Sequence, residues 1–215
     1  FFEASRKFRT PLNRPCCVAL DADGKLLAGD SATREVYRFD EANKPIPLTK
    51  GKIGIPRSIV ALADGELVVA DQELGRLCKV PSAGGDPVDL VKIDGVVALC
   101  VDKNENLWVT SRPTHELIRI DKDGKRENVI SNGPIEFPLD VAVDDSTTVF
   151  IADNYAKADW KVPFGITPVK FVDWAPLFSP AGISISGDKL IVSDPRAKAF
   201  FEIDADGKVT KLFPK

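Results

Sequence analysis

Short apolar segments recur along the chain at a nearly constant interval, and each ends in an acid or a serine. The residues that end them are Asp30, Asp71, Ser111, Asp153 and Asp194, and neighbours in this series lie 40 to 42 residues apart. A fixed period of this length is typical of repeat proteins, in which one supersecondary unit is copied along the chain. The sequence therefore predicts five repeats.

Each repeat predicts four strands. The first strand begins at or near a proline in four of the repeats, and the expected segments are 15–20, 56–61, 96–101, 138–143 and 180–185. The second strand is apolar throughout, which indicates cover on both faces; these segments are 26–29, 67–70, 107–110, 149–152 and 190–193. Third strands alternate better, as more exposed strands do. Fourth strands, such as 126–130 and 168–172, are short and polar and are expected at sheet edges.

Four-stranded antiparallel sheets of about 40 residues, stacked face to face around an axis, describe an all-β fold, the β-propeller. The strings Val68-Val69-Ala70-Asp71 and Phe150-Ile151-Ala152-Asp153 follow a proline-led first strand and a polar turn. In this they resemble the NHL repeat, and the resemblance covers residues 13–213. The third repeat departs from the pattern, with Ser111 in place of the acid and Val96 in place of the proline. Because no linker interrupts the period, we expect residues 1–215 to form a single domain.

The number of blades depends on the first residues. Residues 1–14 align with 124–137, the fourth strand and exit loop of the third repeat, yet the last repeat already has a candidate fourth strand at 209–213. We expect five blades, with an N-terminal strand in residues 1–12 packing beside the last blade. The alternative is a six-bladed ring with one incomplete blade. Five blades are preferred because an open ring would leave apolar faces in water.

Composition and charge limit the classes of partner that the chain can be expected to bind. A net charge of −3 gives no long-range attraction to nucleic acid, and no apolar run approaches the ~20 residues of a membrane span. We expect a monomer that does not insert into a membrane. The chain begins Phe1-Phe2 and contains no methionine, which a cleaved signal peptide would explain, as would an excised segment; a periplasmic or secreted location is favoured. Cys16, Cys17, Cys78 and Cys100 are expected to be mostly buried free thiols.

The five strand-ending positions could form a metal-binding ring or serve the fold. Because the acid recurs in almost every repeat, we expect each carboxylate to accept backbone N–H groups of the loop that leads to the third strand. Asp-x-Asp-Gly turns such as 21–24 lack the further ligands of an EF-hand loop. The sequence therefore predicts no metal and no cofactor. The large apolar residues Trp108 and Phe150 are expected in the core.

Catalysis in a central channel is the less favoured alternative. First strands would bring Asp140 and Arg57 to the channel, one acid and one base. Propellers that resemble the gluconolactonase family hold a divalent cation with several convergent oxygen ligands, which this channel lacks. The single histidine, His115, excludes the multi-histidine zinc site of amidating lyases of related fold. A small-molecule hydrolase or lyase using Asp140 and Arg57 stays open as an alternative.

The favoured function is non-catalytic binding on the face built by loops. The loops between second and third strands each carry a cation or histidine, and the connections between repeats add cations and an apolar stretch at 174–178. Arginine with tryptophan and tyrosine is the composition of interaction hot spots. We expect this face to capture a protein segment or another extended ligand; RNA binding, known in some NHL proteins, is disfavoured by the charge. The predicted ligand-binding residues are Arg14, Arg57, Arg112, His115, Asp140, Asn154, Tyr155, Trp174 and Arg196.

Overall fold

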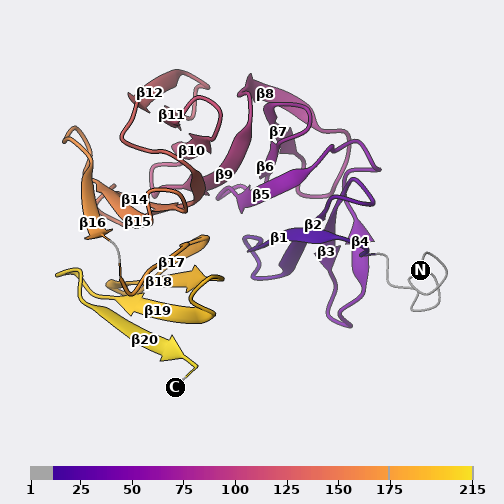
Figure 1. The fold of residues 1–215 in the computed structure, drawn as a ribbon. Helices are drawn as coiled ribbons and strands as arrows, with labels where there is room; N and C mark the ends of the chain where they lie inside the picture. The colour runs from indigo at the N-terminus through magenta and orange to yellow at the C-terminus, as the bar shows by residue number, and fades with distance from the viewer. Residues whose placement is uncertain (1–11, 174, 215) are drawn as a thin grey trace. The chain divides into compact units, whose positions relative to one another are not determined.

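The computed structural model of the chain describes residues 12–173 and 175–214, and the regular elements in this part are β-strands. The described residues form five antiparallel sheets of four strands, each sheet made of consecutive strands (Figure 1). This is the fold of a five-bladed β-propeller, as the sequence predicts. Apart from Leu12, the N-terminal segment predicted to pack beside the last blade lies outside the described residues.

The chain divides into two compact units at the boundary between Val96 and Val97. The first unit contains two complete sheets. Their strands are β1 Pro15–Leu20, β2 Leu26–Asp30, β3 Glu35–Phe39 and β4 Pro45–Pro47, then β5 Pro56–Ala61, β6 Leu67–Asp71, β7 Arg76–Val80 and β8 Val88–Lys92. One core fills the space between these two sheets, with Leu27 and Val36 of one sheet packed against Ile59 and Val69 of the other.

The second unit contains three sheets, of which the first begins at the unit boundary. Their strands are β9 Val96–Val101, β10 Leu107–Ser111, β11 Glu116–Ile120 and β12 Arg126–Ile130; β13 Pro138–Val143, β14 Val149–Asp153, β15 Ala158–Val162 and β16 Val169–Asp173; and β17 Gly182–Ser186, β18 Lys189–Asp194, β19 Ala199–Ile203 and β20 Val209–Phe213. Two cores separate these sheets: Trp108 and Ile151 belong to one, and Phe150 and Phe201 to the other.

Burial confirms the sequence interpretation of the second strands. Every residue of β6, β10 and β14 is buried, because each of these strands is covered on both sides. The predicted core residues Trp108 and Phe150 are 1% and 6% exposed. The fourth strands lie at sheet edges, as predicted. Most strand bounds agree with prediction; β17, however, begins at Gly182 instead of Pro180.

The start of the first strand explains that difference. In β1, β5 and β13 the leading proline lies opposite the strand-ending acid, and the pairing register then shifts by one residue, which is a β-bulge. The extra residues are Cys16, Arg57 and Leu139. The pairing of β17 with β18 has no such shift and starts at Gly182 opposite Ser193. The bulge was not anticipated from the sequence.

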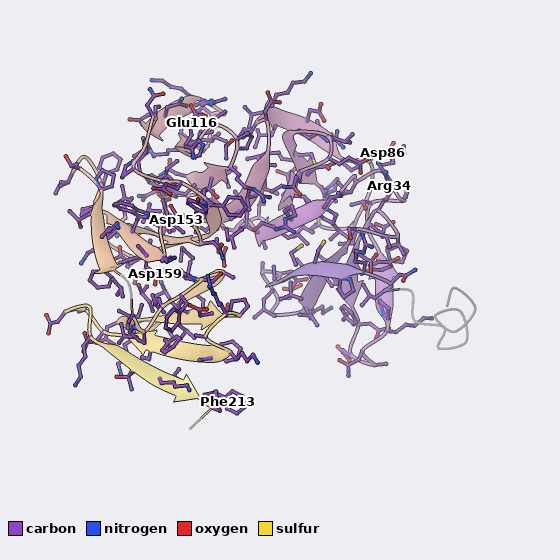
Figure 2. The ribbon with its side chains drawn as sticks, in the orientation of Figure 1. Arg34, Asp86, Glu116, Asp153, Asp159 and Phe213 are labelled. Carbon is purple, nitrogen blue, oxygen red and sulfur yellow. The ribbon has the colours of Figure 1, made fainter. Side chains whose placement is uncertain are left out.

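The strand-ending acids accept backbone hydrogen bonds, as predicted, and do so from two loops at once (Figure 2 labels Asp153). Asp153 accepts from Ala156 N in the loop to the third strand, and from Glu136 N and Phe137 N in the segment before the first strand. The corresponding bonds of Asp30, Asp71 and Asp194 follow the same plan. Each carboxylate therefore joins the entry of its sheet to the loop between its second and third strands.

One backbone feature recurs in the loop after each of these positions, in all five repeats. The fourth residue beyond the strand end has φ between 51° and 59°, the left-handed region, in every repeat; these residues are Arg34, Gly75, His115, Lys157 and Lys198. Only one of the five is glycine, so the backbone conformation of the loop is tolerated by long polar side chains. The repeated loops therefore differ in side-chain chemistry while they share this left-handed residue.

Candidate functional site

A hollow of about 340 Å³ lies on the loop side of the second unit. Its lining comes from three segments: the β14–β15 loop, the connection from β16 to β17, and the β18–β19 loop. The lining residues are Asn154, Tyr155, Lys157, Phe178, Ser179 and Arg196. Three of the predicted binding residues, Asn154, Tyr155 and Arg196, thus lie around one depression. We call this depression the loop hollow.

The loop hollow combines exposed aromatic surface with positive charge. Tyr155 is 74% exposed and Phe178 is 43% exposed, although both are large rings. Lys157 and Arg196 also line the hollow and supply two cations. The side-chain amide of Asn154, in the β14–β15 loop, donates to the hydroxyl of Ser179 and so joins this loop to the connection between β16 and β17. A ligand in this hollow can therefore stack against rings and place an anionic or carbonyl group near a cation.

Arg112 and His115 lie in the β10–β11 loop, and neither lines the loop hollow. The guanidinium of Arg112 lies over the ring of Phe137, 4.6 Å from its centroid. His115 is exposed, and its Nδ1 lies 3.1 Å from the carbonyl oxygen of Ile135. Both side chains therefore contact the segment that leads into β13. These contacts give each side chain a structural role.

Asp140 lies on β13, and its carboxylate bonds to backbone. One oxygen accepts from Val141 N at 2.9 Å and the other from Ile183 N at 2.9 Å, so the side chain joins β13 to β17. Burial raises the pKa of Asp140 to about 6, although these two N–H groups act in the opposite direction. This acid can exchange a proton near neutral pH.

The remaining predicted residues lie elsewhere. Arg14 is exposed in the segment before β1, and Arg57 is the half-buried bulge residue of β5; both belong to the first unit. Trp174 is outside the described residues. The residues that sequence reasoning did not select are Lys157, Phe178 and Ser179. Phe178 lies in the apolar stretch 174–178, which the sequence analysis assigned to the binding face as part of the connection between repeats. Lys157 lies in the same loop as the predicted residues Asn154 and Tyr155.

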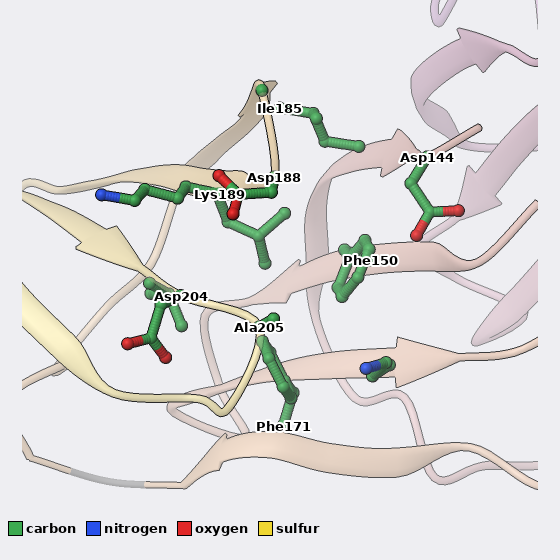
Figure 3. A pocket seen from close by; sticks show the side chains of 12 residues that line it. Asp144, Phe150, Phe171, Ile185, Asp188, Lys189, Asp204 and Ala205 are labelled. Atoms are coloured by element: carbon green, nitrogen blue, oxygen red, sulfur yellow. The ribbon is translucent and has the colours of Figure 1, made fainter. Parts of the chain in front are cut away.

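A second hollow, of about 210 Å³, lies at the hairpin turns of the second unit (Figure 3). Phe150, Phe171 and Ile185 supply its apolar wall. Two cations also line it: Lys189 pairs with Glu202 at 2.7 Å, and the Lys161 ammonium lies 4.8 Å from the centroid of Phe171. The loop hollow is the better candidate for a ligand site because its rings, Tyr155 and Phe178, are exposed, whereas Phe150 is buried.

Two further observations concern the described residues as a whole. Within 12–173 and 175–214, no cluster of three or more His, Cys, Asp or Glu side chains has an arrangement that could hold a metal ion. In the same part of the chain, no helix is long and apolar enough to span a membrane.

Known structures share this fold at low sequence identity. A streptogramin B lyase superimposes with a TM-score of 0.81 and 13% identity, over 95% of this chain and 70% of the lyase. A catalytically inactive histidine-to-alanine variant of virginiamycin B lyase from Staphylococcus aureus, solved with quinupristin, gives a TM-score of 0.75 and 16% identity, over 94% of this chain and 71% of that one. A structure of the nidogen/laminin complex superimposes with a TM-score of 0.78 and 18% identity, over 93% of this chain and 80% of that one.

Sequence comparison adds no relative. No family model matches the chain, and no curated protein matches it. The chain is thus a β-propeller by structure, and its neighbours in fold include a lyase and a protein of a binding complex. Fold alone does not decide between these classes, because one fold carries many functions.

Proposed function

We propose that the chain is a non-catalytic, NHL-type propeller module that captures an extended protein segment in the loop hollow. The observation that carries this proposal is the grouping of exposed Tyr155 and Phe178 with Lys157 and Arg196 around one depression. Aromatic and arginine side chains dominate binding hot spots because they bury large areas and offer several donors. The nidogen/laminin structure is a fold neighbour taken from a protein complex, which agrees with a protein partner.

The chemistry of the loop hollow defines the segment. Two cations at the wall favour a peptide with an acidic side chain, and the exposed rings favour an apolar or aromatic side chain near it. An extended backbone suits the site because the lining comes from three separate loops. We expect one to three anchor side chains to enter the hollow while the rest of the segment crosses the loop face.

A peptide-display selection tests this proposal. The wild-type protein is screened against random peptides, and the selected peptides are titrated by calorimetry. Replacing both Tyr155 and Arg196 with alanine should weaken binding at least about tenfold, which is roughly 1.4 kcal/mol. The free energy of unfolding should change by no more than about 0.5 kcal/mol, because both side chains are exposed.

A matched control removes a ring and a cation from another exposed surface. Phe213 and Lys211 are exposed on the edge strand β20, and the Phe213→Ala, Lys211→Ala variant should bind the selected peptides as the wild type does. Equal weakening in both double variants would show that the loss is not specific to the loop hollow. Failure to enrich any peptide would count against a protein ligand.

A lyase or hydrolase acting through Asp140 is the second candidate, favoured by the raised pKa of that carboxyl. The test incubates the protein with quinupristin, the molecule present in a neighbouring structure, and follows product formation by liquid chromatography with fragmentation mass spectrometry, because an elimination within the molecule keeps the mass while a hydrolysis adds one water. Turnover by the wild type that is lost in Asp140→Asn would favour the enzyme. On the binding proposal, the retention time and the fragment ions of quinupristin stay unchanged in both samples.

A further inference from the structure

Two adjacent thiols in the first unit are held on the same side of their strand. Successive side chains of a regular β-strand point to opposite faces. Cys16 is the extra residue of the β1 bulge, however, and the bulge changes the direction of its side chain. As a result, the sulfurs of Cys16 and Cys17 lie 2.9 Å and 3.1 Å from one atom, the carbonyl oxygen of Pro56.

The neighbouring strand leaves room for this arrangement. A Cβ placed on Gly29 would lie 2.6 Å from the Cys17 sulfur and 2.8 Å from Cγ of Pro56. Any larger residue at Gly29 would therefore displace the thiol. Both cysteines are half-buried and are free thiols, so reagents from solvent can reach the pair.

A positive charge stands beside Cys16. Arg57 is the bulge residue of β5, equivalent to Cys16 in β1, and its charge favours the Cys16 thiolate. The Nε of Arg57 is buried and has no hydrogen-bond partner among residues 12–173 and 175–214. The side chain forms no ion pair with a described carboxylate, so its charge acts on the sulfur without that competition.

The two sulfurs differ in their protonation. A hydrogen bond with Cys17 lowers the pKa of Cys16 to about 7; Arg57 and Ser31 act in the same direction, while burial and Asp30 oppose it. The same bond, together with burial, raises the pKa of Cys17. Near neutral pH the Cys16 sulfur is therefore partly ionised, whereas Cys17 keeps its proton. Burial instead raises the pKa of Cys78 to about 12, and it raises that of Cys100.

We propose that Cys16 and Cys17 form a reactive dithiol site that is oxidised by hydroperoxides, with Cys16 as the residue that attacks the peroxide and Cys17 as the resolving residue. The Cys16 thiolate bonds to the distal oxygen of the peroxide, the O–O bond breaks, and the leaving oxygen takes up a proton to depart as water or an alcohol. Cys16 becomes a sulfenic acid.

Cys17 then completes the reaction. Its sulfur bonds to the Cys16 sulfur, the S–O bond breaks, and the hydroxyl leaves as water with the proton from Cys17. Overall, two thiols lose two electrons and two protons, and one peroxide is reduced. The product is a disulfide between adjacent residues, and a dithiol reductant restores the pair.

Peptide mapping of the wild-type protein tests the proposal without any substitution. The folded protein is treated with hydrogen peroxide, its remaining thiols are alkylated, and the peptides are identified by mass spectrometry. The peptide that holds Cys16 and Cys17 should lose the mass of two hydrogen atoms and should escape alkylation. Cys16 should react at least about tenfold faster than Cys78 or Cys100, because the thiolate is the reactive form.

Variants assign the roles. Cys17→Ser should stop at the sulfenic acid, which a cyclic dione traps at Cys16; Cys16→Ser should leave Cys17 as unreactive as Cys100. Arg57→Ala should slow oxidation of Cys16 severalfold, whereas Arg14→Ala, which removes an exposed cation of the same unit, should not. Equal reactivity of all four cysteines, or oxidation of the pair only to sulfinic acid without the disulfide, would overturn the proposal.

Discussion

Replacing Trp108 with alanine should lower the free energy of unfolding by about 3 to 5 kcal/mol, the usual cost of removing a large buried aromatic side chain. Trp108 is 1% exposed and belongs to the core between the sheet of β9–β12 and the sheet of β13–β16. Its Nε1 donates to Asp102 Oδ2 at 3.0 Å, so the ring is fixed at both its apolar and its polar edge. Denaturant melts followed by circular dichroism measure the loss.

A second substitution separates packing from hydrogen bonding. Trp108→Phe keeps an aromatic ring in the core but loses the bond to Asp102, whose carboxylate still accepts from Asn106 and from the Asn104 N–H. Its cost should be smaller than that of Trp108→Ala, and the missing hydrogen bond accounts for about 1 kcal/mol of it. A loss under about 1 kcal/mol in Trp108→Ala would show that this core tolerates the cavity.

The strands could be predicted from the sequence because each of the five repeats meets the same physical constraints and so shows the same residue pattern. A doubly covered second strand must be apolar throughout, and a carboxylate that binds loop N–H groups must recur at its end. Residues such as Val69 and Asp71 could therefore be assigned by position alone. The bonds of Asp71 to Gly54 N and Ile55 N, before the first strand, were missed because nothing in the sequence marks which N–H groups lie near a carboxylate.

The candidate site could be predicted only in part. Tyr155 and Arg196 were selected because they lie in loops between second and third strands, and because arginine with tyrosine is the composition of interaction hot spots. The sequence did not show that these loops and the connection carrying Phe178 surround one hollow, whereas Arg112 packs on Phe137 instead. That difference depends on packing between neighbouring repeats, and the repeat pattern in the sequence does not report this packing. The β1 bulge that brings two thiols together was missed for another reason, because it depends on the pairing register of β1 with β2.

One acid violates the pattern that made the fold predictable. Asp159 occupies a column that holds Val36, Leu77 and Leu117 in the first three repeats. It is fully buried, and neither carboxylate oxygen has a hydrogen-bond partner among the described residues. Burial raises the pKa of Asp159 to about 8, and the charges of Asp194 and Asp153 add to the effect (Figure 2 labels Asp153 and Asp159). At neutral pH this carboxyl is therefore largely protonated in the folded protein.

The contribution of Asp159 to folding stability should consequently fall as pH rises from about 4 to about 8. In this window the unfolded chain carries an ionised Asp159, since an unperturbed aspartate titrates near about 3.9, while the folded protein keeps the proton. The folded state thus binds more protons, and each pH unit can cost up to about 1.4 kcal/mol. Asp159→Asn and Asp159→Leu lack this titration.

The measurement is the difference in unfolding free energy between each variant and the wild type, at pH 5 and at pH 8. That difference should shift in favour of both variants by at least about 2 kcal/mol between these conditions, whatever the constant cost of the new side chain. Asp145, an exposed acid of the same unit, gives the control, and Asp145→Asn should show a nearly constant difference. Parallel pH profiles for the wild type and Asp159→Asn would show that Asp159 is ionised in the folded protein, with a cation or water supplying the partners that the described residues do not.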